Sequence, residues 1–126
     1  MREEVVLLDP DEMPKAWYNI IPDLPEKLPP PRDPEEGPSR LKYMQQVMLK
    51  TAFEQELSDQ RWIPIPEEVR EIYIHAGRPR PLVRARRLEE YLKTPAKLYY
   101  KREDLSPPGS HKLNTALAQV YYAMKE

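Results

Sequence analysis

A lysine near the C-terminal end of the sequence has the neighbours that amine chemistry needs. Lys112 follows a turn marked by Pro107, Pro108 and Gly109, and an apolar pattern of helical period begins directly after it. The apolar members of that pattern are Leu113, Ala116, Leu117, Val120, Tyr121 and Met124. The sequence therefore predicts a turn that leads into an amphipathic helix, with Lys112 in its first turn.

The start of such a helix suits both an anion and a reactive amine. Backbone N–H groups are free there and the helix dipole favours negative charge, so a phosphate group would be stabilised. The same positive end disfavours a protonated amine, and Ser110 can cap the helix through its hydroxyl group. A deprotonated lysine beside a phosphate site is what an enzyme that forms a Schiff base requires.

A simpler interpretation of the same residues also exists, and the residues alone favour it. Ser110 would then be an ordinary helix cap and Lys112 an exposed lysine of the first turn. The row Ser110, His111 and Lys112 is not a catalytic triad, because adjacent side chains on a helix diverge by about 100° and cannot relay protons.

Several motifs together resemble one enzyme family. Lys101–Leu105, Gly109–Lys112 and Asn114 closely resemble the lysine motif of the tryptophan synthase beta chain. Further similar segments upstream are Gly77–Pro79, Pro81-Leu82, Arg84-Ala85, Leu88-Glu89 and Thr94–Lys97. The longer N-terminal arm of the family's second branch is similar to Pro14–Asn19, Asp23–Pro25 and Leu28–Pro31, and Ile65–Arg70 resembles a segment of the same branch. Arg80 and Pro108 depart from the family, which usually has a small hydroxyl residue and threonine or alanine at these places.

The resemblance implies an α/β fold, as the N-terminal piece of a fold-type II enzyme that uses pyridoxal 5′-phosphate. The full enzyme would condense L-serine with indole to L-tryptophan by β-replacement through an aminoacrylate. Lys112 would hold the cofactor as a Schiff base and would then remove the α-proton. His111 would lie near the cofactor phosphate, and Ser110 and Asn114 would support the turn. No metal is implied.

The resemblance also implies that other parts of the site come from elsewhere. The family supplies a glutamate, a glycine-rich phosphate loop and a partner for the pyridine nitrogen downstream of the lysine motif, whereas the glycines here are Gly37, Gly77 and Gly109. We therefore expect the remainder of the beta chain in a second chain or a further segment, a homodimer of the full enzyme, and an alpha subunit as a further partner. The substrates would be serine and indole. Alone, the chain is expected neither to fold stably nor to catalyse. The alternative is a non-catalytic piece that acts as an assembly or complementation module.

Composition narrows the classes of function. The chain has 126 residues and a formal net charge of −1, so no global field draws in nucleic acid or an anionic membrane. It has no cysteine, which excludes disulfides and thiolate chemistry and makes a cytoplasmic location the default expectation. No apolar run is long enough for a spanning helix or the core of a signal peptide.

The chain divides by composition into two parts. Residues 1–38 form a proline-rich arm, and residues 39–126 would be the N-terminal part of the domain that binds the cofactor. Seven prolines between Pro22 and Pro38 favour a polyproline II conformation. Apolar residues such as Trp17 are costly to leave in water, which favours an arm that packs along a larger body over a disordered leader.

Local signals predict the individual elements. Strands are expected at residues 5–8 and 98–101, the second as a central strand of a parallel sheet, with an extended piece at 62–65. Helices are expected at 39–58 with Ser39 as the cap, at 67–76 with Gly77 as the stop, at 85–92 and at 112–125. His75 is interpreted as structural. The arginines from 78 to 87 are interpreted as a solvated helix face rather than a nucleic-acid patch.

Overall fold

A computed structural model describes residues 4–26, 28–29 and 32–126. These residues form two compact units. The first unit combines the N-terminal segment up to Met13 with Glu67–Thr115, and the second combines Pro14–Pro66 with Ala116–Glu126. Each unit contains one small antiparallel sheet. The division of the sequence at residue 38 into arm and catalytic part stays a prediction.

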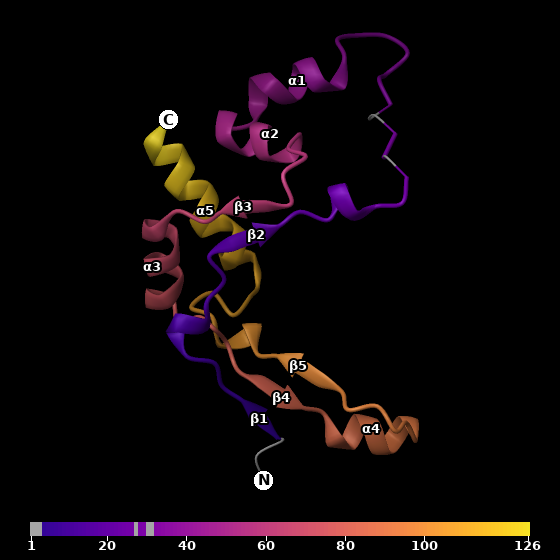
Figure 1. The fold of residues 1–126 in the computed structure, drawn as a ribbon, viewed down its shortest axis with the longest axis vertical. Coiled ribbons are helices and arrows are strands. Elements are labelled where there is room, and N and C mark those ends of the chain that lie inside the picture. The colour runs from indigo at the N-terminus through magenta and orange to yellow at the C-terminus, as the bar shows by residue number, and fades with distance from the viewer. Residues whose placement is uncertain (1–3, 27, 30–31) are drawn as a thin grey trace. The chain divides into compact units, whose positions relative to one another are not determined.

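The sheet of the first unit has three strands in the order β1-β4-β5 (Figure 1). They are β1 (Val5–Val6), β4 (Leu82–Arg84) and β5 (Tyr99–Lys101). Both pairings are antiparallel, and Val83 lies opposite Val5 on one side and Tyr100 on the other. The strands expected at 5–8 and 98–101 are thus confirmed, each over a shorter range.

The sheet nonetheless differs from the prediction in its centre and its direction. The central strand is β4, which no local signal indicated, whereas β5 lies at an edge. The described strands form no parallel pair, so the predicted parallel sheet is not confirmed. The backbone N–H of Ala85 donates to the carbonyl of Leu98 (2.8 Å), which closes the connection between β4 and β5 at its base. This closure brings the chain back antiparallel to β4.

Helix α3 (Glu67–His75) confirms its prediction closely. Glu67 and Glu68 occupy the first turn, where the helix dipole favours negative charge. Val69 and Tyr73, one turn apart, are 0% and 2% exposed and form the centre of the first unit's core. The helix stops at Gly77, whose φ of +83° suits a residue without a side chain.

The first two arginines after α3 correct the prediction of a solvated helix face. Arg80 is buried and donates to the carbonyls of Ala76 and Gly77, so it covers the C-terminal end of α3. The guanidinium of Arg78 lies 4.6 Å from the ring centre of Tyr73. Arg78 and Arg80 thus pack against α3 rather than face solvent. Arg86 and Arg87, in contrast, are exposed in the first turn of the helix α4 (Arg86–Leu92), as predicted.

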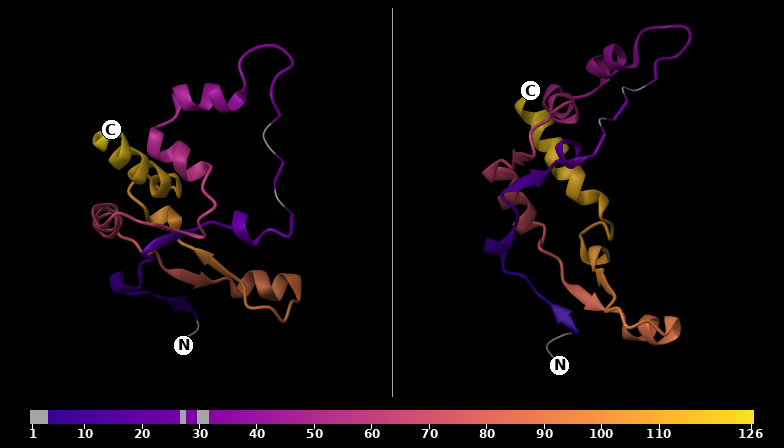
Figure 2. Two further views of the ribbon diagram at one scale, coloured as in Figure 1. Left: turned by 45° about the horizontal axis from the view of Figure 1, so that its top comes forward. Right: turned by 45° about the vertical axis from the view of Figure 1, so that its right-hand side comes forward.

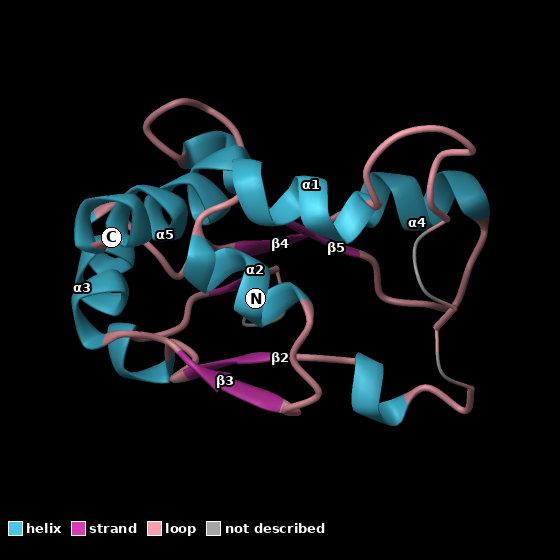
Figure 3. Ribbon diagram, turned by 90° about the horizontal axis from the view of Figure 1, so that it is seen from above, coloured by secondary structure: helices cyan, strands magenta, loops and turns pink. Residues whose placement is uncertain are grey.

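The second unit contains a two-stranded ladder between β2 (Ala16–Tyr18) and β3 (Trp62–Pro64), in which Trp17 lies opposite Ile63 (Figure 3). The side-chain amide of Asn19 extends the contact, because it donates to the carbonyls of Ser58 (2.8 Å) and Gln60 (3.1 Å). The extended piece predicted at 62–65 is confirmed. β2 was not predicted as a strand, but its pairing is the kind of packing expected for the apolar residues of the arm.

The proline run of the arm forms neither helix nor strand at residues 24–26, 28–29 and 32–34. Pro30 and Pro31, which belong to the predicted polyproline II stretch, lie outside the described residues. Short turns of 3₁₀ helix stand at Pro10–Glu12, Ile21–Asp23 and Glu103–Leu105.

The single helix predicted at 39–58 is wrong, because the structure has two helices there. They are α1 (Arg40–Val47) and α2 (Lys50–Glu56), with Met48 and Leu49 extended between them (Figure 2). The predicted cap is confirmed, since the hydroxyl of Ser39 accepts from the N–H of Lys42. The break has a distant cause: the carboxylate of Glu126 accepts from the N–H groups of Lys50 (2.9 Å) and Thr51 (2.8 Å) and so caps a new helix at this point.

Helix α5 (Lys112–Lys125) begins and ends as predicted. Its expected apolar face is covered only in part: Val120 is 56% and Met124 82% exposed, while the buried residue of the helix is Ala118. Among the described residues, no helix combines the length and apolar character that crossing a membrane would require.

Candidate functional site

The candidate site is the turn between the 3₁₀ segment Glu103–Leu105 and the start of α5, within the first unit (Figure 1). Gly109 has a φ of +69°, a conformation that residues with a side chain rarely adopt. Its N–H donates to the carbonyl of Ser106 at 2.7 Å. The chain thereby reverses over Pro107 and Pro108 and enters the helix at Lys112.

Lys112 occupies the first position of α5, as predicted, and its side chain is exposed. Its backbone N–H donates to the hydroxyl of Ser110 at 3.3 Å, so Ser110 caps the first turn as both interpretations of the sequence expected. In the part of the chain that the structure describes, no hydrogen bond or ion pair holds the Nζ atom of Lys112. The amine is therefore accessible to a reagent from solvent.

The other two predicted residues differ in their surroundings. His111 is exposed, and its backbone carbonyl accepts from the N–H of Asn114 at 3.0 Å. Asn114 is half-buried and its side-chain amide donates to Oε2 of Glu103 at 3.2 Å. The carbonyl of Asn114 accepts from the hydroxyl of Tyr73 at 2.6 Å. Asn114 thus fixes the first turn of α5 to α3 and to the preceding 3₁₀ segment.

Sequence reasoning missed two groups of the turn. Ser106 is 5% exposed, and its hydroxyl accepts from the N–H of Ser110 and donates to the carbonyl of the same residue, both at 2.8 Å. Serine is common at the first position of a turn, so its place before Pro107 could have indicated this role. The contact of Tyr73 has no comparable signal, because it depends on a helix 41 residues away in the sequence.

The half-buried ion pair between Arg84 and Glu89 in the first unit supports structure rather than chemistry. Glu89 accepts from the guanidinium of Arg84 (3.0 and 3.2 Å) and from the backbone N–H of Leu98 (2.7 Å). These hydrogen bonds, that of Arg84 first, hold the pKa of Glu89 below its ordinary value. His75 is also structural, since its Nδ1 atom lies 2.9 Å from the carbonyl of Glu71.

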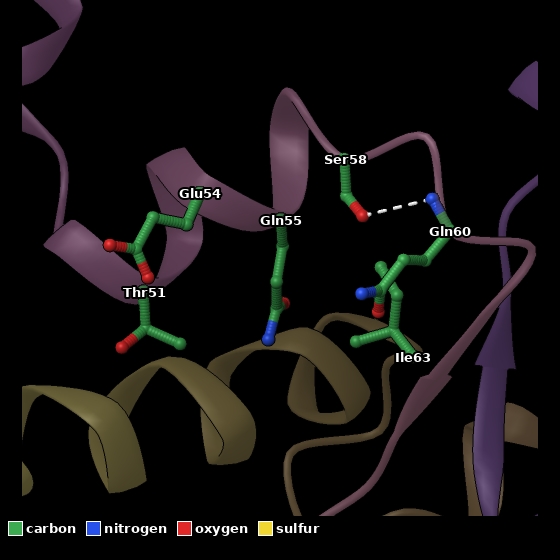
Figure 4. A pocket seen from close by; sticks show the side chains of 6 residues that line it. All are labelled: Thr51, Glu54, Gln55, Ser58, Gln60 and Ile63. Carbon is green, nitrogen blue, oxygen red and sulfur yellow. Dashed lines mark hydrogen bonds between the residues drawn. The ribbon is translucent and has the colours of Figure 1, made fainter.

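Three hollows in the described part of the surface are lined by residues other than the predicted site residues. One, of about 330 Å³, lies in the second unit and is lined by Thr51, Glu54, Gln55, Ser58, Gln60 and Ile63 (Figure 4). Glu54 is the one charged side chain in this lining, so the hollow offers no cation to a phosphate group. The described residues contain no group of three or more histidines and carboxylates placed to hold a metal ion.

Comparisons with known proteins agree with the resemblance of the lysine motif. The chain is 56% identical over 121 residues to the tryptophan synthase beta chain 2 of Methanothermobacter thermautotrophicus, which covers 96% of this chain and 28% of that protein. It is 53% identical over 121 residues to beta chain 1 of Sulfurisphaera tokodaii, with 95% and 29% covered. It is also 53% identical over 122 residues to beta chain 2 of Pyrococcus furiosus, with 96% and 27% covered.

The chain therefore spans somewhat more than a quarter of the length of these relatives. No family model matches it. The identity of half or more of the residues along almost the whole chain confirms the resemblance: the chain corresponds to an N-terminal portion of the tryptophan synthase beta chain.

Proposed function

We propose that this chain supplies the lysine segment of a tryptophan synthase beta enzyme, a lyase that depends on pyridoxal 5′-phosphate and condenses L-serine with indole to L-tryptophan. One observation carries the proposal. An accessible amine, that of Lys112, stands at the first position of a capped helix, in a chain at least 53% identical to three proteins named for this activity.

The groups of the turn fit the cofactor by their chemistry. An aldehyde needs a primary amine, which Lys112 offers without a competing ion pair among the described residues. A phosphate needs hydrogen-bond donors, and Ser110 and His111, which directly precede the helix start at Lys112, carry a hydroxyl and an imidazole. Bound pyridoxal phosphate supplies an electron sink for charge that develops at the α-carbon of an amino acid.

The residues of this chain then have separate tasks. The Nζ atom of Lys112 would hold the cofactor, and as a free amine it would accept the α-proton of serine. Ser110 caps the backbone of Lys112 and so sets where the side chain leaves the helix. Asn114 keeps the first turn of α5 against Tyr73 and Glu103. His111 would lie near the phosphate group of the cofactor.

The rest of the active enzyme would come from the remainder of the beta chain, as a second chain or a further segment. Support comes from the surface, where large apolar side chains remain exposed, among them Leu7 (73%), Tyr91 (83%) and Met124 (82%). Apolar surface of this kind marks contacts with further protein. A homodimer of the full enzyme and an alpha subunit are the further partners that the family implies.

The test is tryptophan formation from serine and indole by the assembly that contains this chain. Lys112→Ala should abolish it. Lys42→Ala is a matched control, because Lys42 also stands in the first turn of a helix and its N–H is also capped by a serine hydroxyl at 3.3 Å. Retained turnover in Lys112→Ala would refute the proposal. An assembly that needs this chain yet shows no turnover even in the unmodified protein would favour the non-catalytic assembly module.

A further inference from the structure

One buried hydroxyl closes the turn that precedes Lys112. Ser106 is 5% exposed, and its Oγ atom makes two hydrogen bonds of 2.8 Å to one residue, Ser110. It accepts from the N–H of Ser110 and donates to the carbonyl of Ser110. Both backbone groups of Ser110 are thereby held by the same side chain.

The turn has few other ways to be held. Pro107 and Pro108 have no N–H group to donate, and the N–H of Gly109 already donates to the carbonyl of Ser106 (2.7 Å). Gly109, with φ at +69°, has no side chain that would restrict its backbone, so other contacts must fix the conformation of the turn. The hydroxyl of Ser106 is therefore the main group that fixes Ser110.

The position of Ser110 in turn affects the backbone of Lys112. Its own hydroxyl accepts from the N–H of Lys112 at 3.3 Å. The helix beyond is held independently, because the carbonyl of Asn114 accepts from the hydroxyl of Tyr73 (2.6 Å). Movement of Ser110 would thus change the backbone at Lys112, while Asn114 would stay in contact with Tyr73.

We propose that Ser106 is a positioning residue, which acts through Ser110 to set the direction in which the amine of Lys112 leaves the helix start. The inference rests on the proposed function, in which that amine attaches pyridoxal phosphate. It adds a residue that touches neither the cofactor nor the substrates.

The experiment compares Ser106→Ala with Ser106→Thr, which keeps the hydroxyl, in the assembly that contains this chain. Ser39→Ala is the matched control, because it removes a serine cap of α1 in the second unit. The first readout is the rate at which Lys112 captures added pyridoxal phosphate, measured by borohydride reduction and peptide mass spectrometry. The second readout, which needs no cofactor, is residue-resolved hydrogen exchange at the N–H groups of Ser110 and Lys112.

We expect Ser106→Ala to slow capture at Lys112 by about tenfold, the effect of roughly one lost hydrogen-bonding group, and to raise exchange at both N–H groups. Ser106→Thr should restore both readouts to within about threefold, and Ser39→Ala should change neither. Capture and exchange at unmodified rates in a folded Ser106→Ala variant would overturn the inference. Capture at a different lysine in the unmodified protein would overturn the proposed function instead, and the exchange of Ser110 and Lys112 would then decide the role of Ser106 by itself.

Discussion

The hydroxyl of Tyr73 gives a prediction whose size follows from the structure. Tyr73 is 2% exposed, its hydroxyl donates to the carbonyl of Asn114 at 2.6 Å, and its ring packs 4.6 Å from the guanidinium of Arg78. Tyr73→Phe keeps the ring and removes the hydroxyl that donates to the carbonyl of Asn114. A neutral hydrogen bond of this kind contributes about 1 kcal/mol net. With a slope of about 2 kcal/mol per molar urea, the unfolding midpoint should fall by about 0.5 M.

The measurement is urea-induced unfolding of the assembly that contains this chain, followed by circular dichroism. Tyr91→Phe is the matched control, because Tyr91 is 83% exposed and the loss of its hydroxyl should leave the midpoint unchanged. Equal midpoints for Tyr73→Phe, Tyr91→Phe and the unmodified protein would show that the contact does not hold α3 to the first turn of α5, and the account of that turn would then be wrong.

Two further predictions concern the first unit. Gly77→Ala should lower the free energy of unfolding by about 1 kcal/mol or more, because φ is +83° and the added methyl group would meet the guanidinium of Arg80. Thermal unfolding measures this change, and an unchanged midpoint temperature would contradict the prediction. The pKa of Glu89 is lowered by its hydrogen bonds from Arg84, so the stability that the pair contributes is present above the ordinary value of 4.5 and is lost as the pH falls below it toward the folded-state pKa. Unfolding midpoints between pH 7 and pH 3 should therefore fall less steeply for Glu89→Gln than for the unmodified protein, and parallel curves would count against the pair.

Elements with signals at both ends could be predicted from the sequence. Helix α3 has two glutamates in its first turn, apolar residues one turn apart and a glycine stop, and its bounds differ from the prediction by one residue. The strand β4 has no such signal, because its three residues lie between a proline and the arginines that follow. Its identity as a strand depends on partners on both sides, Val5 and Tyr100, that are distant in the sequence.

A long-range contact also explains why the helix predicted at 39–58 differs from the structure. The helix predicted at 39–58 breaks because Glu126 caps Lys50 from 76 residues away, and no local pattern encodes that contact. In the candidate site, the cap by Ser110 and the start of the helix at Lys112 could be predicted from the spacing of residues. The chemistry assigned to Lys112 could not, because the spacing fits an ordinary capped helix equally well, and it was the resemblance of the whole motif that favoured the enzyme.

The proposed role of Lys112 is tested most directly by locating the lysine that attaches the cofactor. The assembly that contains this chain is incubated with pyridoxal phosphate and reduced with borohydride, which adds hydride to the carbon of the C=N bond and leaves a stable secondary amine. Peptide mass spectrometry then locates the modified residue. We predict modification of Lys112 and none at the matched residue Lys42, together with loss of the label in Lys112→Ala. A label on another lysine, or the absence of any label under conditions in which the assembly turns over serine and indole, would contradict it.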